Sequence, residues 1–228
     1  MILRQMFDEQ TYTYTYLIAD PESGEAALVD AVREQMDRDL KLLQELGLKL
    51  KYVLETHVHA DHVTAAGPLA DATGAQTVGT GAAPCTQVRV GHGDTLELGG
   101  VTIEVLATPG HTDDSLSFKV GDNVLTGDAL FVRGTGRTDF QNGDANQLYD
   151  SITRVLFALP DDTKVWPGHD YRGHTVSTIG EEKRFNPRVA GKSLEEFVQI
   201  MDNLNLPPPR FIDEAVPANR ACGRAAQG

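Results

Sequence analysis

The segment Thr56–His62, with the sequence Thr-His-Val-His-Ala-Asp-His, carries three imidazoles and one carboxylate within seven residues. It directly follows the strand-like run Lys51–Glu55, so these side chains are expected at the end of a strand. Imidazole and carboxylate groups spaced this closely are typical of a metal site, because both are common ligands of zinc, manganese and iron. The fold must therefore place this loop where a metal ion can be held.

Three other segments place candidate ligands just after short apolar runs. They add His111, Asp128 and His169, which brings the number of candidate ligands to seven. A single histidine at a strand end is usually hydrogen-bonded or exposed, but five of the seven histidines of the chain fall in these segments, and such clustering favours a metal site. No cysteine lies in any of them, so a cysteine-based zinc ribbon is not expected. We expect His92 and His174 to be surface residues or to support the ligands.

Charge and composition narrow the function further. The formal net charge of −13 argues against nucleic acid and against an anionic membrane surface, since both are bound through basic patches. No apolar run approaches the ~20 residues that span a bilayer, and Met1–Asp8 lacks the features of a signal peptide. We therefore expect a cytoplasmic protein with no nucleic-acid or membrane partner. Cys85 and Cys222 lie far apart without motif spacing, so no disulfide framework is indicated.

The apolar pattern predicts a chain with both helices and sheets. Thr11–Ile18 alternates with a period of two, and Glu25–Asp30 offers an antiparallel partner, so the chain is expected to open with a hairpin. Helical spacing over residues 32–46 predicts a helix that joins this hairpin to the next strand in a βαβ-like crossover. Short apolar runs from about residue 76 to 127 predict mostly sheet.

Capping residues predict two later helices. Asp144 with Gln147, and Ser193 with Glu196, are polar pairs three residues apart that precede apolar residues at helical spacing. Two sheets with helices outside them would form a layered α/β sandwich, in which loops at one edge bring the ligands together. The tail Ala221–Gly228 is expected to be frayed.

The order of the candidate ligands resembles the metallo-β-lactamase superfamily: a His-x-His-x-Asp-His segment, a Gly-His pair, an aspartate and a final histidine. This resemblance implies an α/β fold, a metallo-β-lactamase-like four-layer αββα sandwich. The segment Gly136–Gln141, with the sequence Gly-Arg-Thr-Asp-Phe-Gln, is similar to a signature of the persulfide dioxygenase branch. Because the resemblance continues to Val216–Asn219 and covers nearly the whole chain, we expect a single domain over residues 1–228.

The resemblance to the persulfide dioxygenases implies oxidation of glutathione persulfide by O2 and water to sulfite and glutathione at one Fe(II) per chain. In that family two histidines and one aspartate hold the iron, and they match His57, His111 and Asp128 here. Such a triad leaves three positions open for the substrate sulfur and O2. The family resemblance also implies a homodimer.

Four candidate ligands then need another role, and we expect a supporting one around the iron for His59, Asp61, His62 and His169. The same seven residues would serve a binuclear hydrolase of glutathione thioesters, similar to glyoxalase II, in which a metal-bound hydroxide attacks the substrate. The ligands alone do not decide between these functions. The signature Gly136–Gln141 and the short stretch after His169 favour the dioxygenase. A non-catalytic metal-binding protein on this fold is a third alternative.

Substrate charge suggests further site residues. Glutathione persulfide carries carboxylates, so an acidic protein needs local cations near the metal to bind it. Arg137 is the best placed by motif, Arg220 is a weaker candidate, and Tyr171 offers a hydroxyl donor. The alternative for Arg137 is a structural ion pair with Asp139 that holds its loop, and both roles are compatible.

Overall fold

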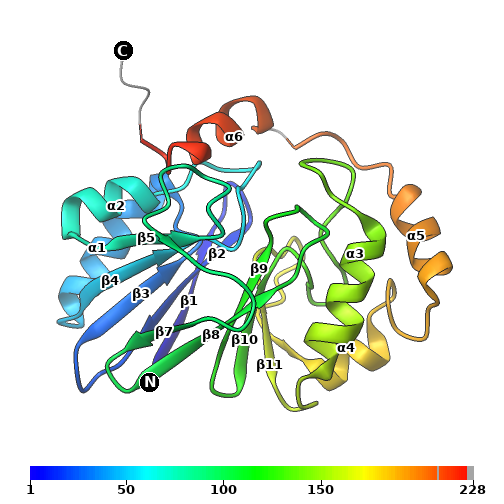
Figure 1. The fold of residues 1–228 in the computed structure, drawn as a ribbon, viewed down its shortest axis with the longest axis horizontal. Coiled ribbons are helices and arrows are strands. Elements are labelled where there is room, and N and C mark those ends of the chain that lie inside the picture. The colour runs from blue at the N-terminus through cyan, green and yellow to red at the C-terminus, as the bar shows by residue number, and fades with distance from the viewer. Residues whose placement is uncertain (210, 225–228) are drawn as a thin grey trace. The chain divides into compact units, whose positions relative to one another are not determined.

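The computed structural model describes residues 1–209 and 211–224. Its internal contacts divide the chain into two compact units, each with its own sheet strands and helices (Figure 1). The first unit comprises Met1–Val90, Thr95–Ile103 and the segment from Pro208 onward, and the second comprises Gly91–Asp94 and Glu104–Pro207. That the whole chain is a single domain stays a prediction.

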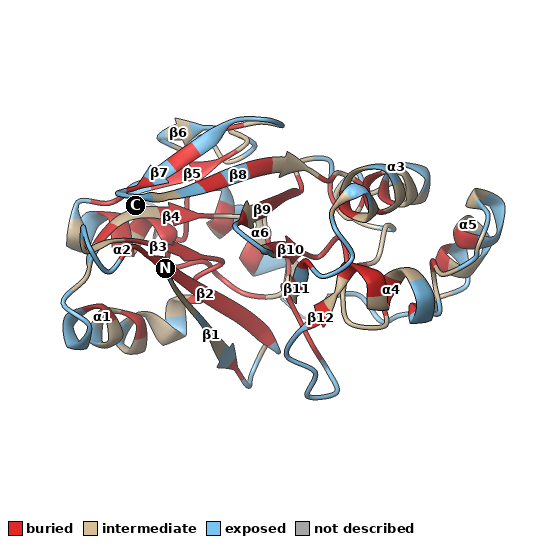
Figure 2. Cartoon of the chain, turned by 90° about the horizontal axis from the view of Figure 1, so that it is seen from below, coloured by how far each residue is buried: buried red, intermediate tan, exposed pale blue. Residues whose placement is uncertain are grey.

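The first sheet has six strands in the order β1-β2-β3-β4-β5-β6. β2 pairs antiparallel with β1 and β3, whereas β3, β4, β5 and β6 are parallel neighbours. β2 is buried along its whole length, as Figure 2 shows. The strands are β1 Ile2–Asp8, β2 Thr13–Ala19, β3 Glu25–Val29, β4 Lys49–Leu54, β5 Gln76–Gly79 and β6 Val88–Arg89.

The described residues of the first unit form three helices: α1 Met36–Glu45, which follows a 3₁₀ turn at Arg33–Gln35, α2 Ala66–Thr73 and α6 Ile212–Arg220. Leu43 of α1 is buried in a core that also contains Leu28 and Val53 from the sheet. Because α1 connects the parallel strands β3 and β4, the predicted helix and the βαβ crossover are confirmed.

The second sheet has the order β12-β11-β10-β9-β8-β7. β10 and β11 are parallel neighbours, whereas β9 pairs antiparallel with β8 and β10, and β11 pairs antiparallel with β12. The division into units passes through β8, so that β7 is counted with the first unit. The strands are β7 Thr95–Leu98, β8 Val101–Ala107, β9 Leu116–Val120, β10 Asn123–Gly127, β11 Lys164–Pro167 and β12 Ser177–Thr178. The helices of the second unit are α3 Ala145–Asp150, which continues as a π-helical turn Ser151–Val155 and a 3₁₀ turn Leu156–Ala158, α4 Ile179–Phe185 and α5 Leu194–Asp202.

Both predicted helix starts of the second unit are confirmed. The Asp144 carboxylate accepts hydrogen bonds from the backbone N–H groups of Asn146 and Gln147 at the start of α3. Ser193 and Glu196 form a reciprocal capping box at the start of α5. These caps satisfy backbone donors that a helix otherwise leaves unpaired in its first turn.

Several expectations were incomplete or wrong. The predicted hairpin is confirmed, because β2 pairs antiparallel with β3, but the chain opens with β1, which pairs with the other edge of β2. Cys85 and Cys222 form a disulfide, although their spacing did not suggest one. Cys222 is also buried, so the expectation of a frayed tail is wrong for Ala221–Arg224, while its remainder lies outside the described residues. Within the described part of the chain, the structure has no helix both long and apolar enough to cross a membrane.

Candidate metal centre

In the first unit, residues 56–64 form a loop between β4 and α2, here called the histidine loop. His57, His59 and His62 are only 4%, 1% and 3% exposed. Their rings follow one another, with centroids 4.1 Å apart for His57 and His59 and 4.4 Å apart for His59 and His62. Buried imidazole nitrogens need partners from the protein or from a bound ligand, so the chemistry of this loop depends on what surrounds each ring.

Thr56 fixes the ring of His57. Thr56 Oγ1 donates to Asp30 Oδ2 over 2.8 Å and lies 3.0 Å from His57 Nδ1. Since the hydroxyl has one proton and gives it to the carboxylate, it accepts the hydrogen bond from His57 Nδ1–H. This tautomer leaves the lone pair of His57 Nε2 for a metal ion.

The ring of His59 lies beside two carboxylates. Its Nε2 is 3.2 Å from Asp30 Oδ1 and 3.4 Å from Glu55 Oε2. Burial opposes a charge on this ring, but the nearby charge of Asp30 and the contacts with Glu55 outweigh burial and raise the pKa of His59 well above its usual value. These contacts place His59 Nε2 beside two carboxylates, but neither ring nitrogen of His59 has a hydrogen-bond partner among the described residues, so its supporting role stays a prediction.

Asp61 and His62 form a pair at the end of the loop. Asp61 Oδ2 lies 2.9 Å from His62 Nδ1, and Thr13 Oγ1 of β2 donates to the same carboxylate oxygen over 3.2 Å. Among the described residues, His62 Nε2 is buried without a hydrogen-bond partner. Leaving such an atom unpaired costs ~1–3 kcal/mol, so this nitrogen fits a loop that binds a ligand. His59, Asp61 and His62 each offer a ligand atom, all within 4.8 Å of one another.

In the second unit, three predicted residues come together from the ends of β8, β10 and β11. His111 Nε2 lies 3.6 Å from Asp128 Oδ2, and His169 Nδ1 lies 2.8 Å from Asp128 Oδ1. A separation of 3.6 Å is too long for a hydrogen bond. Two ligand atoms bound ~2.1 Å from one ion lie ~3–3.5 Å apart, so the spacing of His111 and Asp128 is close to that of two ligands of one metal ion. His169 holds the other carboxylate oxygen.

The segment Gly134–Asp144 follows Asp128 and packs against His111 and Asp128. His111 Nδ1 donates to the carbonyl oxygen of Arg137 over 2.7 Å, which leaves His111 Nε2 for a metal ion. The backbone N–H of Gly136 donates to the carbonyl oxygen of Asp128. A Cβ at Gly136 would lie 2.2 Å from that oxygen and 2.9 Å from His111 Nδ1, so a larger residue does not fit here.

Arg137 forms an ion pair with Asp139, which was the structural alternative to a role of Arg137 in substrate binding. The guanidinium donates to both carboxylate oxygens, over 2.6 and 2.7 Å, and to the carbonyl oxygen of Pro207 over 2.6 Å. The hydrogen bond from Arg137 lowers the pKa of Asp139 and keeps it ionised. The cation is therefore partly neutralised before any substrate arrives, and its role in substrate binding stays a prediction.

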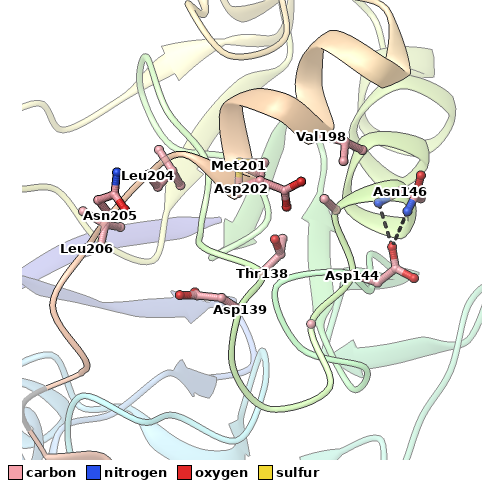
Figure 3. A pocket seen from close by; sticks show the side chains of 12 residues that line it. Thr138, Asp139, Asp144, Asn146, Val198, Met201, Asp202, Leu204, Asn205 and Leu206 are labelled. Atoms are coloured by element: carbon pink, nitrogen blue, oxygen red, sulfur yellow. Dashed lines mark hydrogen bonds between the residues drawn. The ribbon is translucent and has the colours of Figure 1, made fainter.

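Asp139 also lines a pocket of about 590 Å³ in the second unit (Figure 3). Its walls come from the loop before α3, from the first residues of α3, from α5 and from the residues after α5. Asp144 and Asp202 add two more carboxylates, and no lysine or arginine is among the described residues that line the pocket. The pocket suits an ammonium or hydroxyl group better than a carboxylate.

The two other predicted substrate contacts are accessible. Tyr171 is 63% exposed, and its ring stacks on that of His169 with centroids 6.1 Å apart. Arg220 is exposed at the end of α6 in the first unit. Their roles in substrate binding stay predictions.

Two acidic residues beside the histidine loop, Asp30 and Glu55, were not predicted from the sequence. Asp30 accepts hydrogen bonds from the backbone N–H and the hydroxyl of Thr56, and Glu55 accepts one from Thr64 Oγ1. A signal was available, because both directly follow neighbouring parallel strands, β3 and β4. Charged residues at the carboxyl ends of parallel strands often belong to binding sites.

Comparisons with known proteins agree with these observations. A family description, "Metallo-beta-lactamase superfamily", matches residues 9–85 and 84–169. Mitochondrial persulfide dioxygenase ETHE1 of Mus musculus is 48% identical, over 98% of this chain and 89% of that protein. The crystal structure of ETHE1 from Myxococcus xanthus has a TM-score of 0.97 and 63% identity, covering 98% of this chain and 100% of that one.

A more distant solved structure, a metallo-β-lactamase from Staphylococcus aureus subsp. aureus COL, has a TM-score of 0.88 at 28% identity and covers 96% of this chain and 71% of that one. Together with the two mixed sheets and their helices, these likenesses confirm the predicted fold, an α/β sandwich of the metallo-β-lactamase type. The chain belongs to the metallo-β-lactamase superfamily and, within it, to the persulfide dioxygenase family.

Proposed function

We propose that this protein oxidises glutathione persulfide with O2 and water to sulfite and glutathione, in the removal of persulfides. The observation that carries the proposal is the likeness over 98% of the chain to a persulfide dioxygenase that is 48% identical. The signature Gly136–Gln141 supports it, because this segment packs against His111 and Asp128. The thioester hydrolase weighed as an alternative is not favoured by these relatives.

We further propose that His57, His111 and Asp128 hold one Fe(II) per chain. The donor set of two imidazoles and one carboxylate suits iron, and no thiolate is among them. Thr56 and the carbonyl of Arg137 favour the tautomers of His57 and His111 that present Nε2. When bound, the iron supplies the redox chemistry by which O2 reacts with the persulfide sulfur.

The chain's own residues have distinct tasks in this proposal. His169 orients the Asp128 carboxylate through the 2.8 Å hydrogen bond to Oδ1. The contacts of His59 with Asp30 and Glu55 direct its Nε2 toward carboxylates rather than toward the iron. Asp61 and His62 would support the ligands from the histidine loop without binding the iron themselves.

For substrate binding we propose Arg137, Tyr171 and Arg220. The Arg137 guanidinium would exchange part of its contact with Asp139, which is largely exposed, for a carboxylate of glutathione. The ammonium group of the glutamyl residue would then suit the acidic pocket beside Asp139. A cytoplasmic location, a homodimer, and the lack of a nucleic-acid or membrane partner remain predictions from the sequence.

The test is metal content per chain in protein purified without oxygen, together with O2 consumption after addition of glutathione persulfide. One iron per chain, with one O2 consumed per sulfite formed, is the expected result. Two metal ions per chain, no O2 consumption and hydrolysis of S-lactoylglutathione would overturn it. Asp128→Ala should lose iron and turnover together, whereas Asp122→Ala, an exposed aspartate before the same strand, should keep both.

A further inference from the structure

The C-terminal segment of the first unit, residues 211–224, folds back onto the histidine loop, and we call it the C-terminal clasp. Its central residue is Asn219, which is 4% exposed at the end of α6. Asn219 Nδ2 donates to the carbonyl oxygens of His59 and His62, over 2.9 and 2.8 Å, and Oδ1 accepts from the backbone N–H of Thr64 over 2.8 Å. One side chain thus joins three backbone groups of the loop.

These three hydrogen bonds use both donors and one acceptor site of the amide, which fixes its orientation. The loop is neither helix nor strand, apart from an isolated bridge between Thr64 and Val32. Buried backbone groups in such a loop need a partner from elsewhere in the fold. Asn219 supplies it where the candidate ligands are most closely spaced.

The residues after Asn219 hold the clasp in place. The carbonyl oxygen of Cys222 accepts a hydrogen bond from Gly67 N over 2.7 Å, at the start of α2. Gly223 packs so closely that a Cβ there would lie 1.8 Å from the carbonyl oxygen of Thr64. The disulfide between Cys222 and Cys85 ties the same end of the clasp to the loop after β5.

We propose that Asn219 is a positioning residue for the histidine loop and for its proposed metal ligand His57, and that the Cys85–Cys222 disulfide anchors Asn219 there. The proposal rests on the metal site assigned above. Without the amide, the carbonyls of His59 and His62 lose their shared donor, and the histidine loop, which carries His57, samples other conformations. The metal is then held less tightly, although every ligand is still present.

Because the Cys85–Cys222 disulfide anchors Asn219, the affinity for the metal should fall when a thiol reagent reduces this disulfide. A dithiol reduces the disulfide by attack of one thiolate on a cysteine sulfur, followed by closure of the reagent's own disulfide. The S–S bond between Cys85 and Cys222 breaks, two electrons and two protons pass to the cysteines, and the reagent is oxidised. Once reduced, the clasp keeps its hydrogen bonds but loses its covalent tie to the β5–β6 loop.

The first test uses Asn219→Asp, which keeps the size and the acceptor but removes both donors. The dissociation constant for Co(II) is measured on the full chain by competition with a chelator, along with the visible spectrum of bound Co(II). We expect ~10–100-fold weaker binding, the range found when groups that orient metal ligands are lost, and an altered spectrum. Glu214→Gln, an exposed position of the same helix, should bind as the wild type does.

A purely structural role would lower the free energy of unfolding of the metal-free protein and leave the Co(II) dissociation constant unchanged. That result, with affinity within twofold of wild type, overturns the proposal. Should Asn219→Asp fail to fold, Cys85→Ser carries the test, because it frees the clasp and keeps Asn219. It should weaken Co(II) binding several-fold, and unchanged affinity would overturn the role of the anchor.

The second test compares wild type with and without dithiothreitol. Reduction should weaken Co(II) binding to the level of Cys85→Ser, and it should change nothing further in that variant. An equal effect of the reagent on both proteins would show direct competition for the metal and contradict the anchor. Since Co(II) binding is read without persulfide, a failure of the proposed reaction would appear separately, as absent O2 consumption by the iron-loaded wild type.

Discussion

His169 donates a hydrogen bond through Nδ1 to Asp128 Oδ1 over 2.8 Å. The other oxygen of the same carboxylate, Oδ2, lies 3.6 Å from His111 Nε2. By binding Oδ1, the imidazole of His169 leaves Oδ2 as the oxygen of Asp128 that faces His111. His169 is itself buried, so this contact is protected from competition by water.

Replacing His169 with alanine should weaken metal binding without removing a proposed ligand. Outer hydrogen bonds to metal ligands typically change affinity ~10–100-fold, and we expect a loss in this range. The measurement is a chelator competition with Co(II). His174→Ala, at an exposed histidine of the same unit, serves as the control. Complete loss of metal from His169→Ala would instead assign His169 as a ligand.

Gly136 allows a second, purely steric test. In Gly136→Ala the new Cβ would overlap the carbonyl oxygen of Asp128 and crowd the ring of His111. The backbone has to shift, so iron content should fall sharply and the free energy of unfolding by ~1–3 kcal/mol. Gly134→Ala is the matched control, because its Cβ would meet only Phe131 at an ordinary 3.7 Å. Equal iron content in the two variants would contradict the close packing of this segment.

The cluster of His111, Asp128 and His169 in the second unit was largely predictable from the sequence, because its residues obey a local rule. His111, Asp128 and His169 each follow a strand of one sheet, and strand ends at one edge converge. The same rule places the histidine loop after β4. Periodicity also identified α1, whose apolar stripe repeats at helical spacing.

The structure of the C-terminal clasp was not predictable, because it depends on contacts with residues far away in the sequence. Its helix α6 contains Pro217, and proline inside a helix normally argues against one. Contacts of Asn219 with the histidine loop, and a disulfide that spans 137 residues of sequence, compensate for that local preference. Neither leaves a signal in spacing or composition. β1 was missed for a related reason, since its burial lacks a clear alternation.

Variants of Arg137 and Asp139 can distinguish a role in substrate binding from a role in holding the loop. Arg137→Ala should raise KM for glutathione persulfide at least ~10-fold with a smaller change in kcat, as expected when a group binds substrate and transition state equally. Asp139→Asn should leave KM unchanged or lower it, because it releases the guanidinium. The measurement is O2 consumption over a range of substrate concentrations. If both variants keep the wild-type KM and lose stability alike, the ion pair is structural only.

Asp39 of α1 offers a prediction about pH. Its carboxylate is fully buried, and Oδ2 has no hydrogen-bond partner among the described residues, while Arg38 contacts Oδ1 over 2.8 Å. Burial outweighs the attraction of Arg38 and raises the pKa of Asp39 to about 6. The folded state thus binds a proton more tightly than the unfolded state does. Asp39 therefore costs stability above pH ~6, and this cost disappears as the pH falls toward ~4.

Asp39→Asn should raise the free energy of unfolding at pH 7.5 by ~1–3 kcal/mol, since a neutral amide removes the buried charge. At pH 4.5 the gain should shrink by up to ~2 kcal/mol, because Asp39 is then mostly protonated in the folded wild type. Urea unfolding at both pH values measures the difference. Asp37→Asn, at an exposed position of the same helix, should show no such pH dependence. A variant less stable than wild type at pH 7.5 would mean that the charge of Asp39 is needed by Arg38, whose Nη1 donates to the carbonyl oxygen of Phe7.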